Sequence, residues 1–255
     1  MRRKKPALQL HTTTLWDYPS QNYDSEKRQG DTEYAGATPS FIIWNLLNRY
    51  TRKNDLVVDP MAGSGTTLDV ARDLKRRALG YDINPGRDDI YTVDARKLPL
   101  EDSKADFVFI DPPYGDHIKY SDQEECIGSL RADNPAYFQE MEKVISEACR
   151  ILRNNRFMAL YVSDSFRKGA YFVPIGFEIF NILKKYFSPV DIIIVRRYNA
   201  KLKKNHWHTA AVEHNYFLRG FNYLFIMAKT EDWASLPDRR DSAEIANHVK
   251  AMRPV

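Results

Sequence analysis

A tetrad that could act on an amino group, Asp111, Pro112, Pro113 and Tyr114, directly follows the apolar run Phe107–Ile110. Such a run predicts a buried strand, and open α/β sheets bind ligands at the carboxyl ends of their strands. The carboxylate can accept a hydrogen bond from an exocyclic amine, and so can a carbonyl that proline geometry turns inward. Because the tyrosine ring can also stack on a nucleobase, the tetrad predicts a pocket for a flat base with an amino group.

A glycine-rich turn, DPMAGSGTT (59–67), lies upstream of the tetrad. It follows the apolar run Leu56–Val58 and precedes a helical pattern, Leu68–Leu74. Gly63 and Gly65 let the backbone approach a ligand with no Cβ in the way. This strand-to-helix turn therefore favours a nucleotide-like cofactor.

Together the two motifs resemble those of the S-adenosylmethionine-dependent DNA amino-methyltransferases, which modify adenine N6 or cytosine N4. The resemblance extends over residues 38–230, and DPPYGDHIKYSD (111–122) also resembles a subgroup that continues the tetrad with Gly-Asp and Tyr-Ser. The family implies an α/β, Rossmann-like class I methyltransferase fold. Its sheet is mostly parallel and seven-stranded, with the last strand antiparallel and helices on both faces.

The resemblance also implies roles for individual residues. The tetrad is the predicted catalytic set. Asp82 follows the glycine turn by about twenty positions, where nucleotide-binding units bind a ribose diol, and Asp94 corresponds to the family's adenine-facing position. The predicted cofactor-binding residues are Thr38, Pro39, Asp59, Pro60, Met61, Ala62, Gly63, Ser64, Gly65, Thr66, Asp82, Asp94 and Asp111.

A basic segment, RRYNAKLKKNHWH (196–208), has five Lys or Arg residues, no acidic residue, a Trp and a Tyr. Basic loops with interleaved aromatic residues suit a nucleic-acid backbone and an unstacked base. A solvated charged hairpin is the alternative. The predicted nucleic-acid contacts are Arg196, Arg197, Lys201, Lys203, Lys204 and, beyond the tetrad, Lys119.

Alternating strand and helix patterns predict a mostly parallel sheet. Thr38 is the expected N-cap of a first helix that has Pro39 at its first position. We predict an N-terminal arm (1–37), a methyltransferase domain (38–230) with a basic loop (196–216), and a C-terminal tail (231–255). The predicted strands are 56–59, 78–84, 90–93, 107–110, 157–162, 190–195 and 223–228, and the helices 66–75, 137–152 and 177–187.

The composition is that of a globular protein, with 43% hydrophobic and 28% charged residues among 255. No apolar run is long enough to span a bilayer, and the basic N-terminus has no apolar segment behind it, which predicts a cytoplasmic protein. The net charge of +4 is compatible with a polyanionic partner. Cys126 and Cys149 lack a CxxC spacing, and His206 and His208 lack further ligands, so no metal site is expected.

The leading hypothesis is methylation of adenine N6 in DNA, since cytosine-modifying members of the family often have serine where this chain has Asp111. Cytosine N4 of DNA is one alternative, and a base amine of tRNA or rRNA is another. A non-catalytic subunit that binds nucleic acid is a third. The recognition sequence, a restriction partner and the oligomeric state stay open.

Overall fold

A computed structural model describes residues 8–24, 26–31, 33–34, 36–113, 126–166, 172–198 and 201–236. Its main sheet contains strands β1 (Leu15–Trp16), β2 (Leu56–Asp59), β3 (Arg77–Asp82), β4 (Tyr91–Thr92), β5 (Ala105–Ile110), β6 (Leu152–Val162), β9 (Ser188–Arg196) and β10 (Phe221–Lys229). A separate pair consists of β7 (Ser165–Phe166) and β8 (Phe172–Val173). The helices are α1 (Ser40–Tyr50), α2 (Thr66–Asp73), α3 (Pro135–Ile151), α4 (Ile175–Tyr186) and α5 (Asn205–Glu213), with 3-10 turns η1 (Ile127–Ser129), η2 (Lys201–Lys203) and η3 (Trp233–Ser235).

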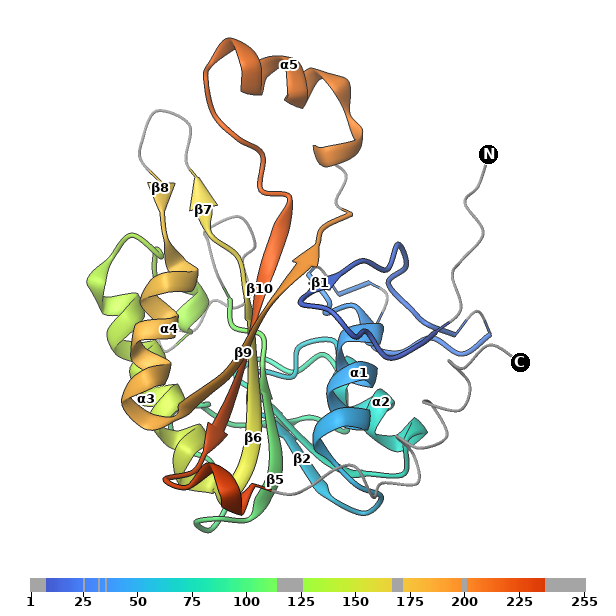
Figure 1. Cartoon of the computed structure of the whole chain (residues 1–255), viewed down its shortest axis with the longest axis vertical. Coiled ribbons are helices and arrows are strands. Elements are labelled where there is room, and N and C mark those ends of the chain that lie inside the picture. Colours follow the sequence, from blue (N-terminus) through green and yellow to red (C-terminus); the bar gives the residue numbers. More distant parts are fainter. Residues whose placement is uncertain are drawn as a thin grey trace.

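The strand order of the main sheet is β1-β9-β10-β6-β5-β2-β3-β4 (Figure 1). Neighbouring strands from β4 to β6 are parallel, whereas β10 runs antiparallel between β6 and β9. Apolar side chains of α1 and α2 form one buried cluster with the sheet, and those of α3 and α4 form another. This architecture confirms the predicted α/β fold class with helices on both faces.

The predicted strand number of seven was wrong, because β1 adds an eighth strand. Leu15 and Trp16 pair in parallel with Ile194 and Val195 of β9. Trp16 is 1% exposed, its indole Nε1 donates to the Thr13 carbonyl at 2.9 Å, and its ring packs near that of Phe41. Burial of this large aromatic side chain stabilises a strand that is too short to be recognised by alternation.

Three local predictions also need correction. Helix α1 begins at Ser40 with Pro39 as its N-cap, and Thr38 makes no capping bond because its hydroxyl donates to Asp111 instead. Asn154-Asn155, just after the predicted helix 137–152, would suit a left-handed helix cap, but α3 ends at Ile151 and continues directly into β6, so that Asn155, with φ of 60°, lies inside a strand. The segment expected to be a loop contains α5.

The carboxyl ends of β2, β3, β5 and β6 lie at one edge of the sheet, since these strands are parallel and in register. Val58 pairs with Val108, and Ile110 pairs with Leu160. The residues that follow these strands, including Asp111 and Ser163, are thereby brought to the same edge.

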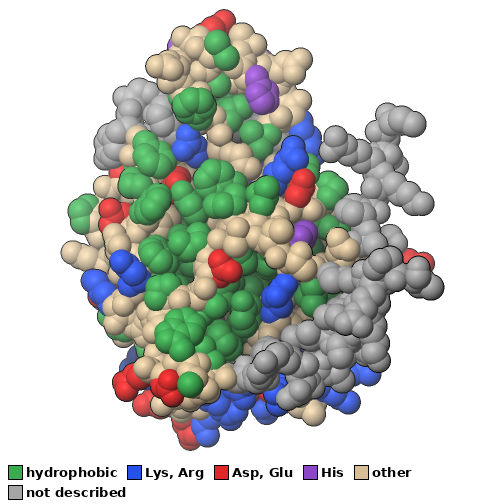
Figure 2. Space-filling view, viewed as in Figure 1, with side chains coloured by type: hydrophobic (Ala, Val, Ile, Leu, Met, Phe, Trp, Pro, Cys, Tyr) green, Lys and Arg blue, Asp and Glu red, His purple; other side chains and the backbone are tan. Residues whose placement is uncertain are grey.

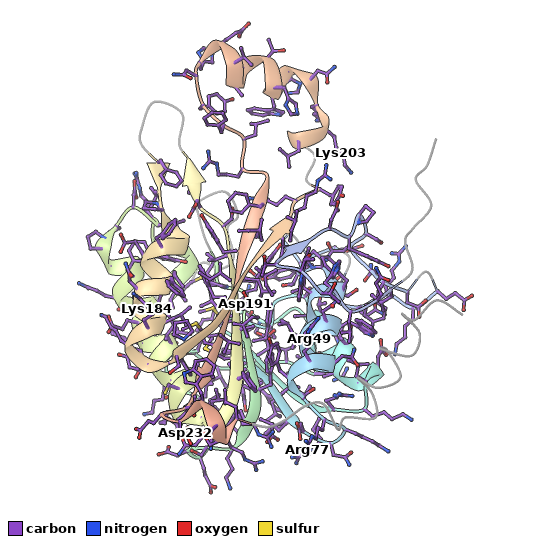
Figure 3. All side chains as sticks on the ribbon, viewed as in Figure 1. Arg49, Arg77, Lys184, Asp191, Lys203 and Asp232 are labelled. Atoms are coloured by element: carbon purple, nitrogen blue, oxygen red, sulfur yellow. The ribbon has the colours of Figure 1, made fainter. Side chains whose placement is uncertain are left out.

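Helix α5 connects β9 to β10 and projects beyond this edge (Figure 1). It contributes no buried side chain, and Lys203 lies at its base (Figure 3). Hydrophobic side chains gather over the middle of the face shown in Figure 2. None of the described helices combines the length and apolar character that a bilayer crossing requires.

Candidate active site

Asp111 lines a pocket at the carboxyl edge of the sheet with about 540 Å³ of empty space, part of it open to solvent. The glycine turn, the ends of β3 and β5, the segment after β4 and the start of η1 all contribute to it. Its lining residues are Tyr34, Pro60, Met61, Asp82, Ile83, Asp94, Ala95, Asp111, Pro113, Cys126, Ile127 and Gly128. Two tetrad residues and four of the predicted cofactor residues besides Asp111 are thus brought together in one cavity.

The Asp111 carboxyl is strongly perturbed by its surroundings. Burial and the nearby Asp59 carboxyl raise its pKa to about 8, while the Thr38 hydroxyl, which donates to Oδ2, and the positive charge of Arg197 act in the opposite direction. Among the described residues, Oδ1 of Asp111 has no hydrogen-bond partner. Thr38 therefore holds one carboxylate oxygen, and no hydrogen bond from the described part of the chain occupies the other.

The glycine turn has a backbone geometry that requires glycine. Gly63 and Gly65 have φ of 45° and 77°, a region that L-residues with a Cβ rarely adopt. The Gly63 amide donates to Oδ2 of Asp82 at 2.9 Å. A Cβ on Gly63 would lie 3.0 Å from the ring of Tyr34, so this glycine leaves room for an aromatic wall of the pocket.

Asp59 stabilises the glycine turn by hydrogen bonds to both of its ends. Its buried carboxylate accepts bonds from the Thr67 hydroxyl at 2.6 Å and the Met61 amide at 3.0 Å. Burial raises its pKa to about 7, against the lowering effect of these two bonds. Several predicted cofactor residues belong to this supporting layer and are absent from the pocket lining of the described structure: Asp59, Ala62, Gly63, Ser64, Gly65 and Thr66.

Asp94 lines the pocket and is held by Arg96. The guanidinium donates to both carboxylate oxygens, with Nη2 to Oδ2 at 2.6 Å, and Nη1 reaches Glu140 at 2.5 Å. Burial raises the pKa of Asp94, but the bonds from Arg96 outweigh it and lower the pKa overall. Asp94 is therefore a fixed, ionised acceptor at the wall of the pocket.

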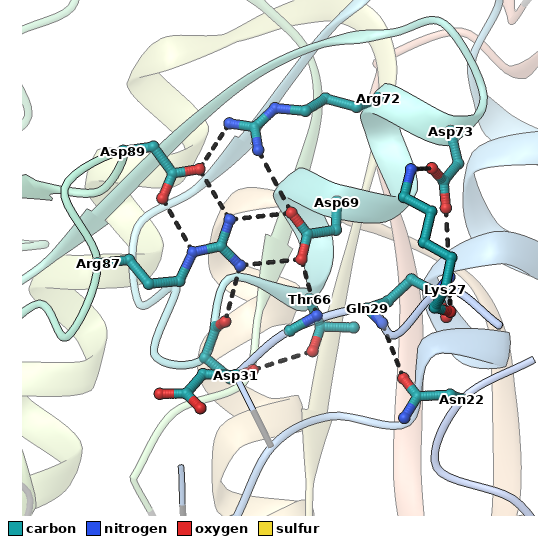
Figure 4. A network of polar contacts seen from close by, with 12 residues as sticks. Asn22, Lys27, Gln29, Asp31, Thr66, Asp69, Arg72, Asp73, Arg87 and Asp89 are labelled. Carbon is teal, nitrogen blue, oxygen red and sulfur yellow. Dashed lines mark hydrogen bonds and ion pairs between the residues drawn. The ribbon is translucent and has the colours of Figure 1, made fainter. Parts of the chain in front are cut away.

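The N-terminal arm lies over the glycine turn and is anchored by a polar network (Figure 4). The Asp31 amide donates to the Ser64 carbonyl at 2.8 Å, and the Gly30 amide donates to Asp69 at 2.8 Å. Arg87 bridges Asp69 and Asp89, with four bonds of 2.8 to 2.9 Å. No sequence motif indicated this network. It anchors the arm that contributes Tyr34 to the lining of the pocket.

The predicted nucleic-acid residues separate into two groups. Lys203 and Lys204 are exposed near α5, whereas Arg196 pairs with Asp17 at 3.1 Å. The charge of Arg197 acts on Asp111, and its Nη1 donates to the Ser163 hydroxyl at 3.0 Å. Tyr114 and Lys119 lie outside the described residues, as does the side chain of Lys201.

No group of three His, Cys, Asp or Glu side chains within the described residues is arranged to hold a metal ion. The residues that line the pocket offer carboxylates, aromatic surface and backbone groups. This combination suits an organic ligand with hydroxyl and amino groups.

A model of the N6/N4 DNA methylase family matches residues 2–92 and 105–253. The chain belongs to this DNA methylase family. Within the chain, 68 residues are 41% identical to the type II methyltransferase M.HindIII of Haemophilus influenzae, covering 27% of this chain and 21% of that protein. A further match of 73 residues is 36% identical to the type II methyltransferase M1.MboII of Moraxella bovis, covering 28% of each. The chain thus matches less than a third of the length of these curated relatives.

Solved structures similar to this DNA methylase include a SAM-dependent methyltransferase of Methanosarcina mazei, with a TM-score of 0.47, 13% identity and coverage of 73% of this chain and 98% of that one. A phosphoethanolamine-type N-methyltransferase of Haemonchus contortus, in complex with S-adenosylhomocysteine, has a TM-score of 0.44 and 15% identity, and the match covers 74% of this chain and 52% of that one. The fold itself is defined by the strand order and directions described above.

Proposed function

We propose that this DNA methylase transfers a methyl group from S-adenosylmethionine to the exocyclic amine of an extruded DNA base, with adenine N6 as the target. The observation that carries the proposal is the single pocket shared by Asp111, Asp82 and Asp94. It combines an acceptor for an amine with acceptors for a nucleoside. The type II methyltransferase relatives support DNA as the substrate.

The residues present fit S-adenosylmethionine, which supplies an electrophilic methyl group when bound. Asp82 and Asp94 would accept hydrogen bonds from its ribose and adenine, and Tyr34 and Met61 would provide apolar surface. The positive φ of Gly63 keeps the turn compact beneath that surface. These assignments extend the roles predicted for Asp82 and Asp94 and add Tyr34.

An exocyclic amine is a poor nucleophile because its lone pair is delocalised into the ring. In the proposed reaction the amine donates one N–H to Oδ1 of Asp111 and the other to the carbonyl of Pro112. These two acceptors draw the nitrogen toward tetrahedral geometry and stabilise the positive charge that develops on it. Asp111 must be ionised to act in this way.

The target base must leave the duplex stack, at a cost of a few kcal/mol. We assign the compensating interactions to Tyr114, by stacking on the base, and to the basic residues of the connection that contains α5, by contacts with phosphates. Lys203 and Lys204 are exposed on that connection, and Arg197 lies between it and Asp111.

The test is incubation of the protein with methyl-labelled S-adenosylmethionine and either plasmid DNA or total RNA, followed by mass spectrometry of the nucleosides. We expect N6-methyladenine in DNA and none with Asp111→Ala. Detection of N4-methylcytosine in DNA would show that the target is cytosine. Label in RNA alone would contradict the proposal that DNA is the substrate. Binding of DNA without any transfer would favour a non-catalytic subunit.

A further inference from the structure

Thr38 lies outside the tetrad but touches its carboxylate. Its hydroxyl donates to Oδ2 of Asp111, across 73 residues of sequence. Thr38 is 8% exposed, and it is not among the residues that line the pocket of the described structure. Its contact therefore points at the catalytic side chain and not at the cavity.

The backbone around Thr38 is held from both sides. The side-chain amide of Gln21 donates to the carbonyls of Ala37 and Thr38 at 2.9 Å each, and the Gln21 carbonyl accepts from the Ser40 amide at 2.9 Å. Pro39, with φ of −61°, restricts the turn into α1. The hydroxyl is thus presented to Asp111 by a rigid segment.

We propose that Thr38 is a positioning residue for methyl transfer: it holds Oδ2 of Asp111 so that Oδ1 accepts the N–H of the target amine. This inference rests on the proposed function of Asp111. It replaces the cofactor contact that the sequence predicted for Thr38. By donating to the carboxylate, the hydroxyl also favours the ionised form that can accept from the amine.

Thr38→Val removes the hydroxyl with little change of shape, and Thr38→Ser retains it. We expect Thr38→Val to lower kcat by about 10- to 100-fold, less than the loss caused by removing a direct transition-state contact. The Kd for S-adenosylmethionine, measured by calorimetry, should stay within about twofold of wild type. Thr38→Ser should recover most of kcat, and thermal melting should show all three proteins folded.

Two results would overturn the proposal. One is an unchanged kcat for Thr38→Val. The other is a weaker cofactor Kd that accounts for the whole loss, which would make Thr38 a cofactor ligand as the sequence predicted.

A second measurement separates failure of this inference from failure of the proposed function, because it needs no turnover. The Asp111 carboxyl carbon, labelled with ¹³C and assigned by its absence from Asp111→Asn, is titrated by NMR. We expect its pKa to be higher in Thr38→Val than in wild type and Thr38→Ser. Equal pKa values of Asp111 in the three proteins would show that the Thr38 hydroxyl does not donate to this carboxyl in solution. If the variants show this difference in pKa but the wild-type protein transfers no methyl group to DNA, the hydrogen bond is supported and the proposed reaction is rejected.

Discussion

Asp111 is placed where its ionisation is difficult, and this has a consequence for catalysis. Burial and the Asp59 carboxyl disfavour the charged form, whereas Thr38 and Arg197 favour it. A protonated carboxyl would offer a donor to the amine on one oxygen, where the reaction needs an acceptor. The pKa of the proposed acceptor therefore lies close to the pH range in which the protein would act.

We expect kcat/KM for DNA to rise with pH and to level off above about pH 8, because the pKa of Asp111 is raised to about 8 in the free protein. Below that pH the rate should fall by up to tenfold per unit. The measurement is a pH-rate profile at saturating S-adenosylmethionine. A profile that is flat between pH 6 and 9 would contradict a requirement for ionised Asp111.

Asp111→Asn keeps the shape of the side chain but removes its charge. We expect transfer to fall by about 10²–10³-fold, in line with the removal of one transition-state contact. Cofactor affinity should change little, because Asp82 and Asp94 are the proposed ligands of the nucleoside. Single-turnover assays and calorimetry check the two quantities, with exposed Asp191→Asn on β9 as the control (Figure 3). Equal losses of both quantities would assign Asp111 to cofactor binding.

At the scale of elements, the connection from β9 to β10 is the proposed DNA-contacting unit. Helix α5 projects from the same edge that holds the pocket and packs no side chain into the core. Arg197 links its base to the site, with its amide donating to the Gly220 carbonyl and its guanidinium to Ser163. Because α5 buries no side chain, it adds little to the stability of the fold, and we expect it to contact a partner.

Replacement of both Lys203 and Lys204 by Gln should weaken DNA binding at all sequences and reduce the slope of log K against log salt by about 1–2. The reason is the loss of two counterion-releasing phosphate contacts. Fluorescence anisotropy from 50 to 200 mM salt would measure this slope. Lys184→Gln, at an exposed position of α4, is the matched control (Figure 3). An unchanged salt slope in the double variant would show that Lys203 and Lys204 do not contact DNA phosphates.

The arm and the glycine turn form a second functional element, joined by Arg87. This side chain is 21% exposed and contacts Asp69, Asp89 and the Ser64 carbonyl. Arg87→Met should lower the free energy of unfolding by about 1–3 kcal/mol, since it removes four hydrogen bonds to Asp69 and Asp89 and leaves them with the half-exposed Arg72. It should also weaken cofactor binding.

Arg72→Met is the comparison for Arg87→Met, because Arg72 shares both carboxylates but its side chain is 50% exposed. Its loss should cost less than about 1 kcal/mol. Chemical denaturation measures both variants. Equal losses of unfolding free energy in the two variants would show that Arg87 contributes no more to the network than Arg72.

For the whole molecule, the two raised carboxyl pKa values predict a loss of stability with increasing pH. Folded Asp59 and Asp111 hold protons up to about pH 7 and 8, whereas in the unfolded chain both are ionised above about pH 4. The folded state therefore binds more protons in this window, and its stability falls as pH rises. His11, whose pKa is lowered by burial, acts in the opposite direction only below its usual value of 6.5.

Between pH 6.5 and 8.5 we thus expect the Tm of the wild type to fall and that of Asp111→Asn to fall less. Each kcal/mol of difference corresponds to about 2–4 °C for a domain of this size. Differential scanning calorimetry measures it. Parallel curves for the two proteins would show that Asp111 does not titrate in this range.

Much of the fold was readable from the sequence, because apolar runs and glycine turns act locally. The run that ends at Asp59 and the one that ends at Ile110 are strands in the structure, and the glycine turn between strand and helix lies where the sequence predicts it. The tetrad and the glycine turn, being tied to strand ends, were predicted to meet because parallel strands carry their carboxyl ends to one edge.

Contacts between distant segments were decided only by tertiary structure. The bond from Thr38 to Asp111, the strand formed by Leu15 and Trp16, and the approach of Tyr34 to Gly63 join residues that no local pattern relates. Each depends on how the arm crosses the finished sheet, and the free energy comes from burying side chains against surfaces that exist only after folding. Sequence periodicity records the faces of single elements, so it placed Asp111 at a strand end but did not indicate that the Thr38 hydroxyl donates to this carboxylate.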